Sequence, residues 1–118
     1  MGKITQLTDI EIYKEALLLS RDVYVLCKSP ILRSEYSLSD QVKRASVSVA
    51  ANIAEGYGRG TKADFARFLA IALGSTNEVV ALIDLMKLSF TKLETTDIRQ
   101  RYIVLSKRIY AFKRKLNS

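Results

Sequence analysis

Histidine is absent from the 118 residues of this sequence. Histidine is the commonest general base in enzymes and the commonest protein ligand of metal ions, so its absence removes both roles. The metal sites of four-helix proteins use Glu-x-x-His pairs, which cannot form here. We therefore predict a protein that is not an enzyme, with no catalytic residue, no metal and no cofactor. An enzyme that uses Glu55, Glu78 and Arg44 is the minor alternative, because no nucleophile is paired with a base.

Cysteine and long uncharged segments are also scarce. The one cysteine, Cys27, cannot form an internal disulfide, and its place on an apolar helix face indicates a packed structural thiol. The longest charge-free segments, residues 45–54 and 68–77, are ten residues each, whereas about 18 apolar residues are needed to span a bilayer. The first residues lack the apolar core of a secretory signal. We expect a cytoplasmic protein that does not engage a membrane.

Proline and glycine are few, and they mark two of the three breaks between four amphipathic segments. Pro30 follows the first segment, and Gly56, Gly58 and Gly60 follow the second. Within the segments, apolar residues recur at steps of three and four, as they do in bundle helices. The sequence predicts one all-α domain over residues 1–118, an antiparallel up-down-up-down four-helix bundle with helices at about 9–28, 39–56, 62–90 and 96–116.

Two local patterns indicate where helices begin. Thr8 and Glu11 have the spacing of a capping box, in which two side chains accept from free amides at a helix start. Thr61 with Asp64 offers an N-cap to the third helix. The glycine-rich residues 55–60 are interpreted as a helix stop and a turn. Phosphate binding at the N-terminus of the next helix is the alternative.

Acidic residues are absent after Asp97, and this makes the last helix basic. Residues 1–97 carry twelve charges of each sign, so the seven later cations supply the whole net charge of +7. Tyr110 lies opposite the apolar seam among these cations, a combination that suits phosphate neutralisation with base stacking. A solvated helix face is the alternative, and no base-reading motif is present. The predicted nucleic-acid-binding residues are Arg99, Lys107, Arg108, Tyr110, Lys113, Arg114 and Lys115.

A polar row runs along the second helix between two apolar edges. At helical spacing its side chains fall within about one quarter of the circumference, so we expect them to lie in an interface. Ser75 and Glu78 of the third helix face this row, and an Arg44–Glu78 ion pair is predicted. A structural network is the favoured interpretation, and an active or ligand site is the alternative. The predicted network comprises Gln41, Arg44, Ser48, Asn52, Glu55, Ser75 and Glu78.

The first helix has more apolar surface than one bundle contact needs. Its second apolar row contains Tyr13, Leu17, Tyr24 and Cys27. We expect part of this row to contact another subunit, because a lone bundle would leave it in water. The sequence therefore predicts a homo-oligomer.

Three motifs give the chain a resemblance to the 23S rRNA-intervening sequence proteins, a ribosomal-protein-like family. They are residues 41–45 (QVKRA), 48–56 (SVAANIAEG) and 68–75 (FLAIALGS) with Glu78. Tyr13 stands near the place where the family often has tryptophan, which this chain lacks. The resemblance covers almost the whole chain. It implies a bacterial protein with a left-handed up-down bundle that assembles into a ring-like homopentamer, similar to the accessory variability determinant of diversity-generating retroelements.

The resemblance and the basic helix together point to a function. The accessory variability determinant partners a reverse transcriptase and nucleic acid through a basic surface, and the genes of the family lie in spacers within ribosomal RNA genes. We expect a non-enzymatic, oligomeric protein that binds RNA or an RNA–protein complex through its last helix. The alternative is an assembly adaptor that binds a protein, such as an accessory partner of a reverse transcriptase. The basic charge would then serve solubility or an acidic partner.

Overall fold

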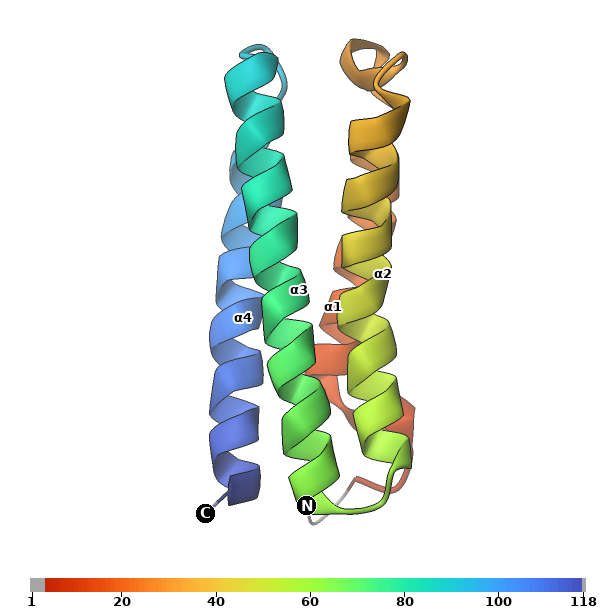
Figure 1. The fold of residues 1–118 in the computed structure, drawn as a ribbon, viewed down its shortest axis with the longest axis vertical. Coiled ribbons are helices and arrows are strands. Elements are labelled where there is room, and N and C mark those ends of the chain that lie inside the picture. Colours follow the sequence, from red (N-terminus) through yellow and green to blue (C-terminus); the bar gives the residue numbers. More distant parts are fainter. Residues whose placement is uncertain (1–3, 118) are drawn as a thin grey trace.

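The computed structural model describes residues 4–117, which form four α-helices and two short 3₁₀-helices and contain no strand (Figure 1). The predicted all-α fold with four helices is confirmed. The molecule is 45 Å long and 20 Å across in both other directions. Its elements are η1 (Leu7–Asp9), α1 (Glu11–Cys27), η2 (Pro30–Leu32), α2 (Tyr36–Gly58), α3 (Lys62–Ser89) and α4 (Thr96–Asn117).

Contacts between α2 and α3 show how neighbouring helices are aligned. The hydroxyls of Ser48 and Ser75 share a hydrogen bond of 2.9 Å. Gly56, which comes later in α2, lies against Phe65 and Phe68, which come earlier in α3. The two helices therefore run in opposite directions, and Figure 1 shows short connections between all consecutive helices. Among the four pairs of neighbouring helices, α2–α3 is the most closely packed and α1–α4 the least. Both ends of the described chain lie beside the α2–α3 turn (Figure 1).

The start of α1 differs from the predicted capping box. The Asp9 carboxylate accepts hydrogen bonds from the backbone amides of Thr5 and Gln6, each at 3.0 Å, so it caps η1. These amide donors hold the pKa of Asp9 below its ordinary value. Thr8 lies inside η1, and the residue before α1 is Ile10, whose side chain makes no capping bond. The predicted Thr8–Glu11 capping box was wrong, because Thr8 lies within a separate 3₁₀ turn whose preceding amides are satisfied by Asp9.

The bounds of α2 extend beyond the prediction at both ends. Ser39 was expected to start the helix, but its amide donates to the Glu35 carbonyl at 3.0 Å and therefore lies within the first turn. At the other end α2 continues through Gly56 to Gly58. Gly60, with φ of 87°, is the residue that makes the turn. At the start of α3, the Thr61 hydroxyl accepts a hydrogen bond of 3.1 Å from the Asp64 amide and so caps the helix as predicted. The Asp64 carboxylate is not needed for this cap.

The core consists of the predicted apolar seams. Along α3 the buried residues of the seam follow one another at steps of three and four. Within this seam only Thr76 is polar, with the buried Ser75 beside it. The Thr76 hydroxyl donates to the Leu73 carbonyl at 2.7 Å, so the buried oxygen is satisfied within its own helix. Cys27 is buried, as expected for a packed thiol. The seam of α3 contains Phe65, Leu69, Ala72, Thr76, Val79, Ile83 and Met86, and that of α4 contains Ile98, Tyr102, Leu105, Ile109 and Leu116.

α3 is unusually apolar for a helix with a solvent-facing side. By length and composition alone it could cross a membrane, since a window within it reaches a mean hydropathy of 1.6. Only 39% of that window is buried inside the protein. The observation is weak evidence for a membrane, because the core helix of a bundle passes the same test. It does show that α3 exposes apolar surface.

Candidate nucleic-acid interface

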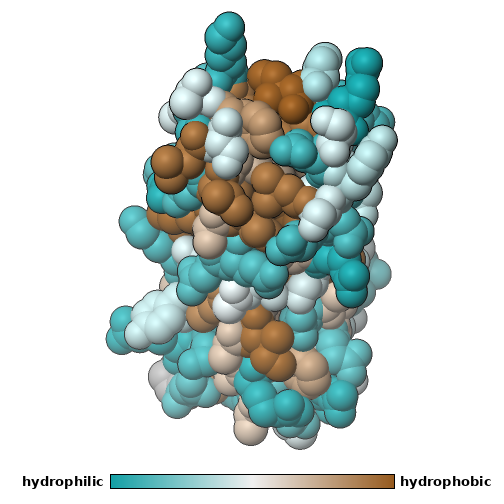
Figure 2. All heavy atoms as spheres, turned by 45° about the horizontal axis from the view of Figure 1, so that its top comes forward, coloured by the Kyte–Doolittle hydropathy of each residue, from teal (hydrophilic) through white to brown (hydrophobic). Residues whose placement is uncertain are grey.

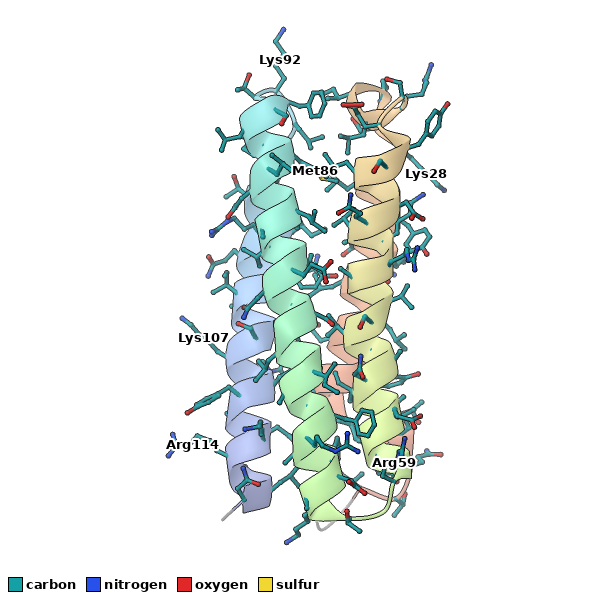
Figure 3. The ribbon with its side chains drawn as sticks, viewed as in Figure 1. Lys28, Arg59, Met86, Lys92, Lys107 and Arg114 are labelled. Carbon is teal, nitrogen blue, oxygen red and sulfur yellow. The ribbon has the colours of Figure 1, made fainter. Side chains whose placement is uncertain are left out.

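The C-terminal half of α4 presents one exposed face that combines two cations with an aromatic ring. Lys107, Tyr110 and Arg114 follow one another at steps of three and four, which places them on the same side of the helix. Lys107 and Arg114 project from α4 in the same direction, away from the other helices (Figure 3). Tyr110 is 54% exposed to solvent. This face of α4, together with the neighbouring half-buried Lys113, is called the basic face below.

The basic face has no internal neutralising partner within residues 4–117. Neither Lys107 nor Arg114 forms an ion pair there, and the same holds for Lys113. Free cations can replace the counterions that surround a phosphate backbone, and an exposed ring between them can stack on a base. The arrangement can therefore bind a polyanion that offers unstacked bases.

Arg99 does not belong to this face, although it was predicted to. Its Nε and a terminal NH₂ lie 2.6 Å and 3.2 Å from the two carboxylate oxygens of Asp84 on α3. This bidentate contact holds the pKa of Asp84 below its ordinary value and raises the pKa of Arg99. Unlike Lys107 and Arg114, Arg99 therefore already has an acidic partner within the chain, and its role in nucleic-acid binding stays a prediction.

Arg108 and Lys115 lie on a different side of α4. Both line a shallow groove of about 350 Å³ beside the N-terminal segment, together with Ile10 and Phe112. The structure therefore divides the seven predicted residues. Lys107, Tyr110, Lys113 and Arg114 come together, Arg108 and Lys115 face the N-terminal segment, and Arg99 pairs with α3.

Arg101 explains why a linear count of charges overstates the basic character of α4. Its guanidinium donates to Asp22 of α1 at 2.8 Å and lies 3.7 Å from Glu15 and 3.6 Å from Asp97. Acids from the first half of the chain thus neutralise the first turns of a helix that looks uniformly basic in sequence. Within residues 4–117, the α4 cations Lys107, Lys113 and Arg114, in its last three turns, form no ion pair.

Further cations at the α2–α3 turn were missed by the sequence argument. Arg59 and Arg67 both lie over the ring of Phe68, at 5.0 Å and 4.6 Å from its centroid. They keep acidic partners, at 2.8 Å for Arg59–Glu55 and 3.5 Å for Arg67–Asp64. The turn lies at the same end of the bundle as the C-terminus of α4 (Figure 1). Assigning each turn to an end of an antiparallel bundle would have shown this proximity.

The polar row of α2 forms a smaller network than predicted. Ser48 and Ser75 bond across the α2–α3 interface, and Asn52 Nδ2 donates to the Ser48 carbonyl at 2.8 Å and to its hydroxyl at 3.0 Å. Ser75 is buried, and Ser48 and Asn52 are partly buried. The Ser48–Ser75 bond joins the two helices, and Asn52 supports Ser48 from within α2.

The outer members of the row have local partners instead. Arg44 lies 3.7 Å from Asp40, one turn earlier, and both side chains are largely exposed. Glu78 is exposed and has no ion pair within residues 4–117, so the predicted Arg44–Glu78 pair within one chain was wrong. Exposed side chains take the nearest partner on their own helix, at i+4. Gln41 likewise bonds Ser37, and Glu55 pairs with Arg59.

Comparison with known proteins identifies the family. The model of the 23S rRNA-intervening sequence protein matches residues 8–111. The chain belongs to this family. No functionally curated protein matches the chain. A crystal structure from the S23 ribosomal protein family, a protein of unknown function from Bacteroides thetaiotaomicron, aligns with a TM-score of 0.77 and 22% identity over 86% of this chain and 97% of that one. At this identity the likeness shows the fold alone.

The family match divides the basic face. It includes Lys107 and Tyr110 and ends at residue 111, before Lys113 and Arg114. It also contains the whole polar row of α2 and the outer side of α3. The resemblance read from the three motifs is therefore confirmed, while the last cations of α4 lie outside the matched part of this family member.

Proposed function

We propose that this protein binds RNA, alone or within an RNA–protein complex, through the basic face of α4. The proposal includes no catalytic step. The observation that carries it is the placement of Lys107, Tyr110 and Arg114 on one exposed face, where no acid of residues 4–117 pairs with either cation. The name of the family, which refers to 23S rRNA, supports an RNA partner. We place this function in the cytoplasm of a bacterium, as expected from the sequence.

The same proposal includes self-association. We propose an up-down-up-down bundle whose copies assemble into a ring-like homo-oligomer, a homopentamer as the resemblance implies. A single basic face offers few phosphate contacts, and each contributes a salt-sensitive increment to affinity. Repeating the face in every subunit makes later contacts intramolecular and raises the overall affinity without any new residue. An oligomer would also cover apolar surface on α1 and α3.

The test is fluorescence anisotropy of a labelled structured RNA across a salt series, with duplex DNA as competitor. Wild-type protein is expected to bind, with log affinity falling by about 0.7–0.9 per neutralised phosphate for each unit of log salt. The variant K107E/R114E is expected to lose about tenfold or more in affinity with folding intact. The matched control is K28E/K92E, which changes the net charge equally at the opposite end of the bundle (Figure 3). Absence of binding at low salt would contradict the proposal.

A second candidate function is a protein-binding adaptor, such as an accessory partner of a reverse transcriptase. The observation that favours it is the exposed apolar surface, which Figure 2 shows at the end formed by the α1–α2 and α3–α4 connections and on the adjoining face. Ile31, Leu85 and Leu88 contribute there, with 38%, 50% and 78% of their surface exposed. If the protein is an adaptor, it is expected to capture a partner protein from cell extract equally well before and after nuclease treatment.

A further inference from the structure

Two apolar surfaces lie on different sides of the bundle. The first is a groove of about 230 Å³ between α1 and α2, called the groove. The second is the outer side of α3 from Ala70 to Leu85, called the ridge, where every exposed residue except Glu78 is uncharged. The groove is lined by Tyr13, Leu17, Ser20, Val47, Ala50, Ala51 and Ala54, and the ridge consists of Ala70, Ile71, Gly74, Asn77, Glu78, Ala81 and Leu85.

We propose that the ridge of one copy of this chain occupies the groove of a second copy, and that Glu78 of the ridge pairs with Arg44 beside the groove. Arg44 lies on α2 one turn from the groove residue Val47. Within one chain its contact with Asp40 is long, 3.7 Å, and leaves 80% of the Arg44 side chain exposed. Glu78 is the one acid on the ridge and has no ion pair within residues 4–117. The two surfaces thus carry complementary charges.

The height of the two residues along the bundle follows from the Ser48–Ser75 hydrogen bond. Because α2 and α3 are antiparallel, Arg44, four residues before Ser48, and Glu78, three residues after Ser75, lie toward the same end. At about 1.5 Å per residue these offsets are about 6 Å and 4.5 Å, so the two side chains start within about 2 Å of the same height. Two copies that stand parallel and level therefore bring Glu78 of one to Arg44 of the other.

The apolar residues match at the same setting. Ile71, four residues before Ser75, comes level with Asn52, and hence with Ala51 on the floor of the groove. The side of α3 that bears Glu78 is the side that faces α2, because Ser75 is one turn away. When parallel copies meet ridge to groove, that side lies toward α2 of the receiving copy, where Arg44 is. In an inverted copy it would lie toward α1.

The sides of the bundle that bear the ridge and the groove are large enough for a stable contact. One side of the bundle measures 45 Å by 20 Å, and a stable interface needs about 800 Å² from each partner. Ridge and groove are different surfaces, so each copy can use both, and the chain of contacts closes into a ring or continues as a filament. The inference rests on the self-association included in the proposed function, but it does not require RNA binding.

The experiment is sedimentation velocity of the full chain over a concentration series, with R44E, E78R, the double variant and an equimolar mixture of the two single variants. Wild type is expected to associate, and each single variant to associate at least about tenfold more weakly. The double variant is expected to recover, because each of its interfaces regains one acid and one base. The mixture is expected to associate more strongly than either single variant alone, because every contact between unlike copies pairs an acid with a base, while a ring of five keeps one contact between like copies. The K92E variant, altered at the end of the bundle, is expected to match wild type, and circular dichroism checks that all variants are helical.

Several outcomes would overturn the inference. These are a wild type that stays monomeric at every concentration, single variants that associate like wild type, and a mixture that associates no more strongly than either single variant alone. If a charge variant fails to fold, an oxidised mixture of R44C and E78C proteins gives a second test, and lack of a disulfide between them would overturn it too. RNA anisotropy on the same samples separates the two proposals. If the protein binds RNA but stays monomeric, only the proposed interface is refuted. If it forms an oligomer that does not bind RNA, only the proposed RNA-binding function is refuted.

Discussion

The Arg101 guanidinium on α4 donates a hydrogen bond of 2.8 Å to Asp22 on α1 and so joins the last helix to the first. The α1–α4 pair is the least closely packed of the neighbouring helix pairs, so polar contacts matter more there than elsewhere. Glu15 and Asp97 also lie within 4 Å of the same guanidinium. All of these side chains except Asp97 are mostly shielded from solvent, with Arg101 at 34% exposure.

Replacing Arg101 by methionine is expected to lower the free energy of unfolding by about 1 kcal/mol, the upper part of the range for ion pairs that are not fully buried. Three acids lose their shared partner, and their mutual repulsion adds to the loss. The control is Lys14→Met, which removes an exposed pair with Glu11 at 2.9 Å and should have a smaller effect. Urea unfolding measures both. Equal effects would show that the α1–α4 cluster stabilises no more than a surface pair.

Asp84 gives a pH-dependent contribution to stability. The hydrogen bond from Arg99 lowers its pKa in the folded protein below the ordinary value of 3.8. The stabilisation is therefore present above the pKa of the unfolded chain and is lost as the pH falls through the lower, folded value. Asp84→Asn should remove it, so the difference between wild type and variant should shrink as the solution is acidified below about pH 4.

Thermal unfolding at low ionic strength measures this difference, because the pair is exposed and salt screens it. Asp9 and Glu94 also have lowered pKa values and contribute to the acid dependence of both proteins. Their contribution cancels when the two curves are subtracted. A difference that stays constant down to low pH would contradict the assignment to Asp84.

Gly56 permits the close approach of α2 and α3. A Cβ atom at this position would lie 2.7 Å from Phe68 Cβ and 3.0 Å from Phe65 Cδ1. Gly56→Ala is therefore expected to destabilise the protein by about 1–3 kcal/mol through overpacking. Gly58→Ala is the matched control, since a Cβ there meets nothing within 4 Å and alanine favours the helix. Chemical denaturation that shows G56A as stable as G58A would contradict the close packing.

The helices and the core were predictable because each depends on residues close in sequence. The seam of α3 needs only the three-and-four periodicity, and the turn at Gly60 needs only a residue that tolerates positive φ. The start of α1 was mispredicted because Asp9 accepts from the amides of Thr5 and Gln6 and so holds Thr8 inside a separate 3₁₀ turn, which the helical periodicity does not reveal. Charges on α4 were harder still. Arg99 and Arg101 look as free as Lys107 until the facing helices bring Asp84 and Asp22 beside them.

Substitution of Tyr110 distinguishes base stacking from charge neutralisation in the proposed RNA interface. Tyr110→Ala removes the exposed ring from the basic face and leaves Lys107 and Arg114 in place. Affinity for a single-stranded or looped RNA is expected to fall by the equivalent of about 1–3 kcal/mol, while the dependence of log affinity on log salt stays the same.

Removal of a cation should give the opposite pattern. Arg114→Ala is expected to reduce the salt slope by about one phosphate contact, with a similar loss of affinity for every sequence. Tyr36→Ala is the matched control for the aromatic change, because Tyr36 is 79% exposed at the start of α2, at the other end of the bundle from the C-terminus of α4. Anisotropy titrations at several salt concentrations measure both affinity and slope. If Tyr110→Ala changes the slope but Arg114→Ala does not, the roles assigned to ring and cation are wrong.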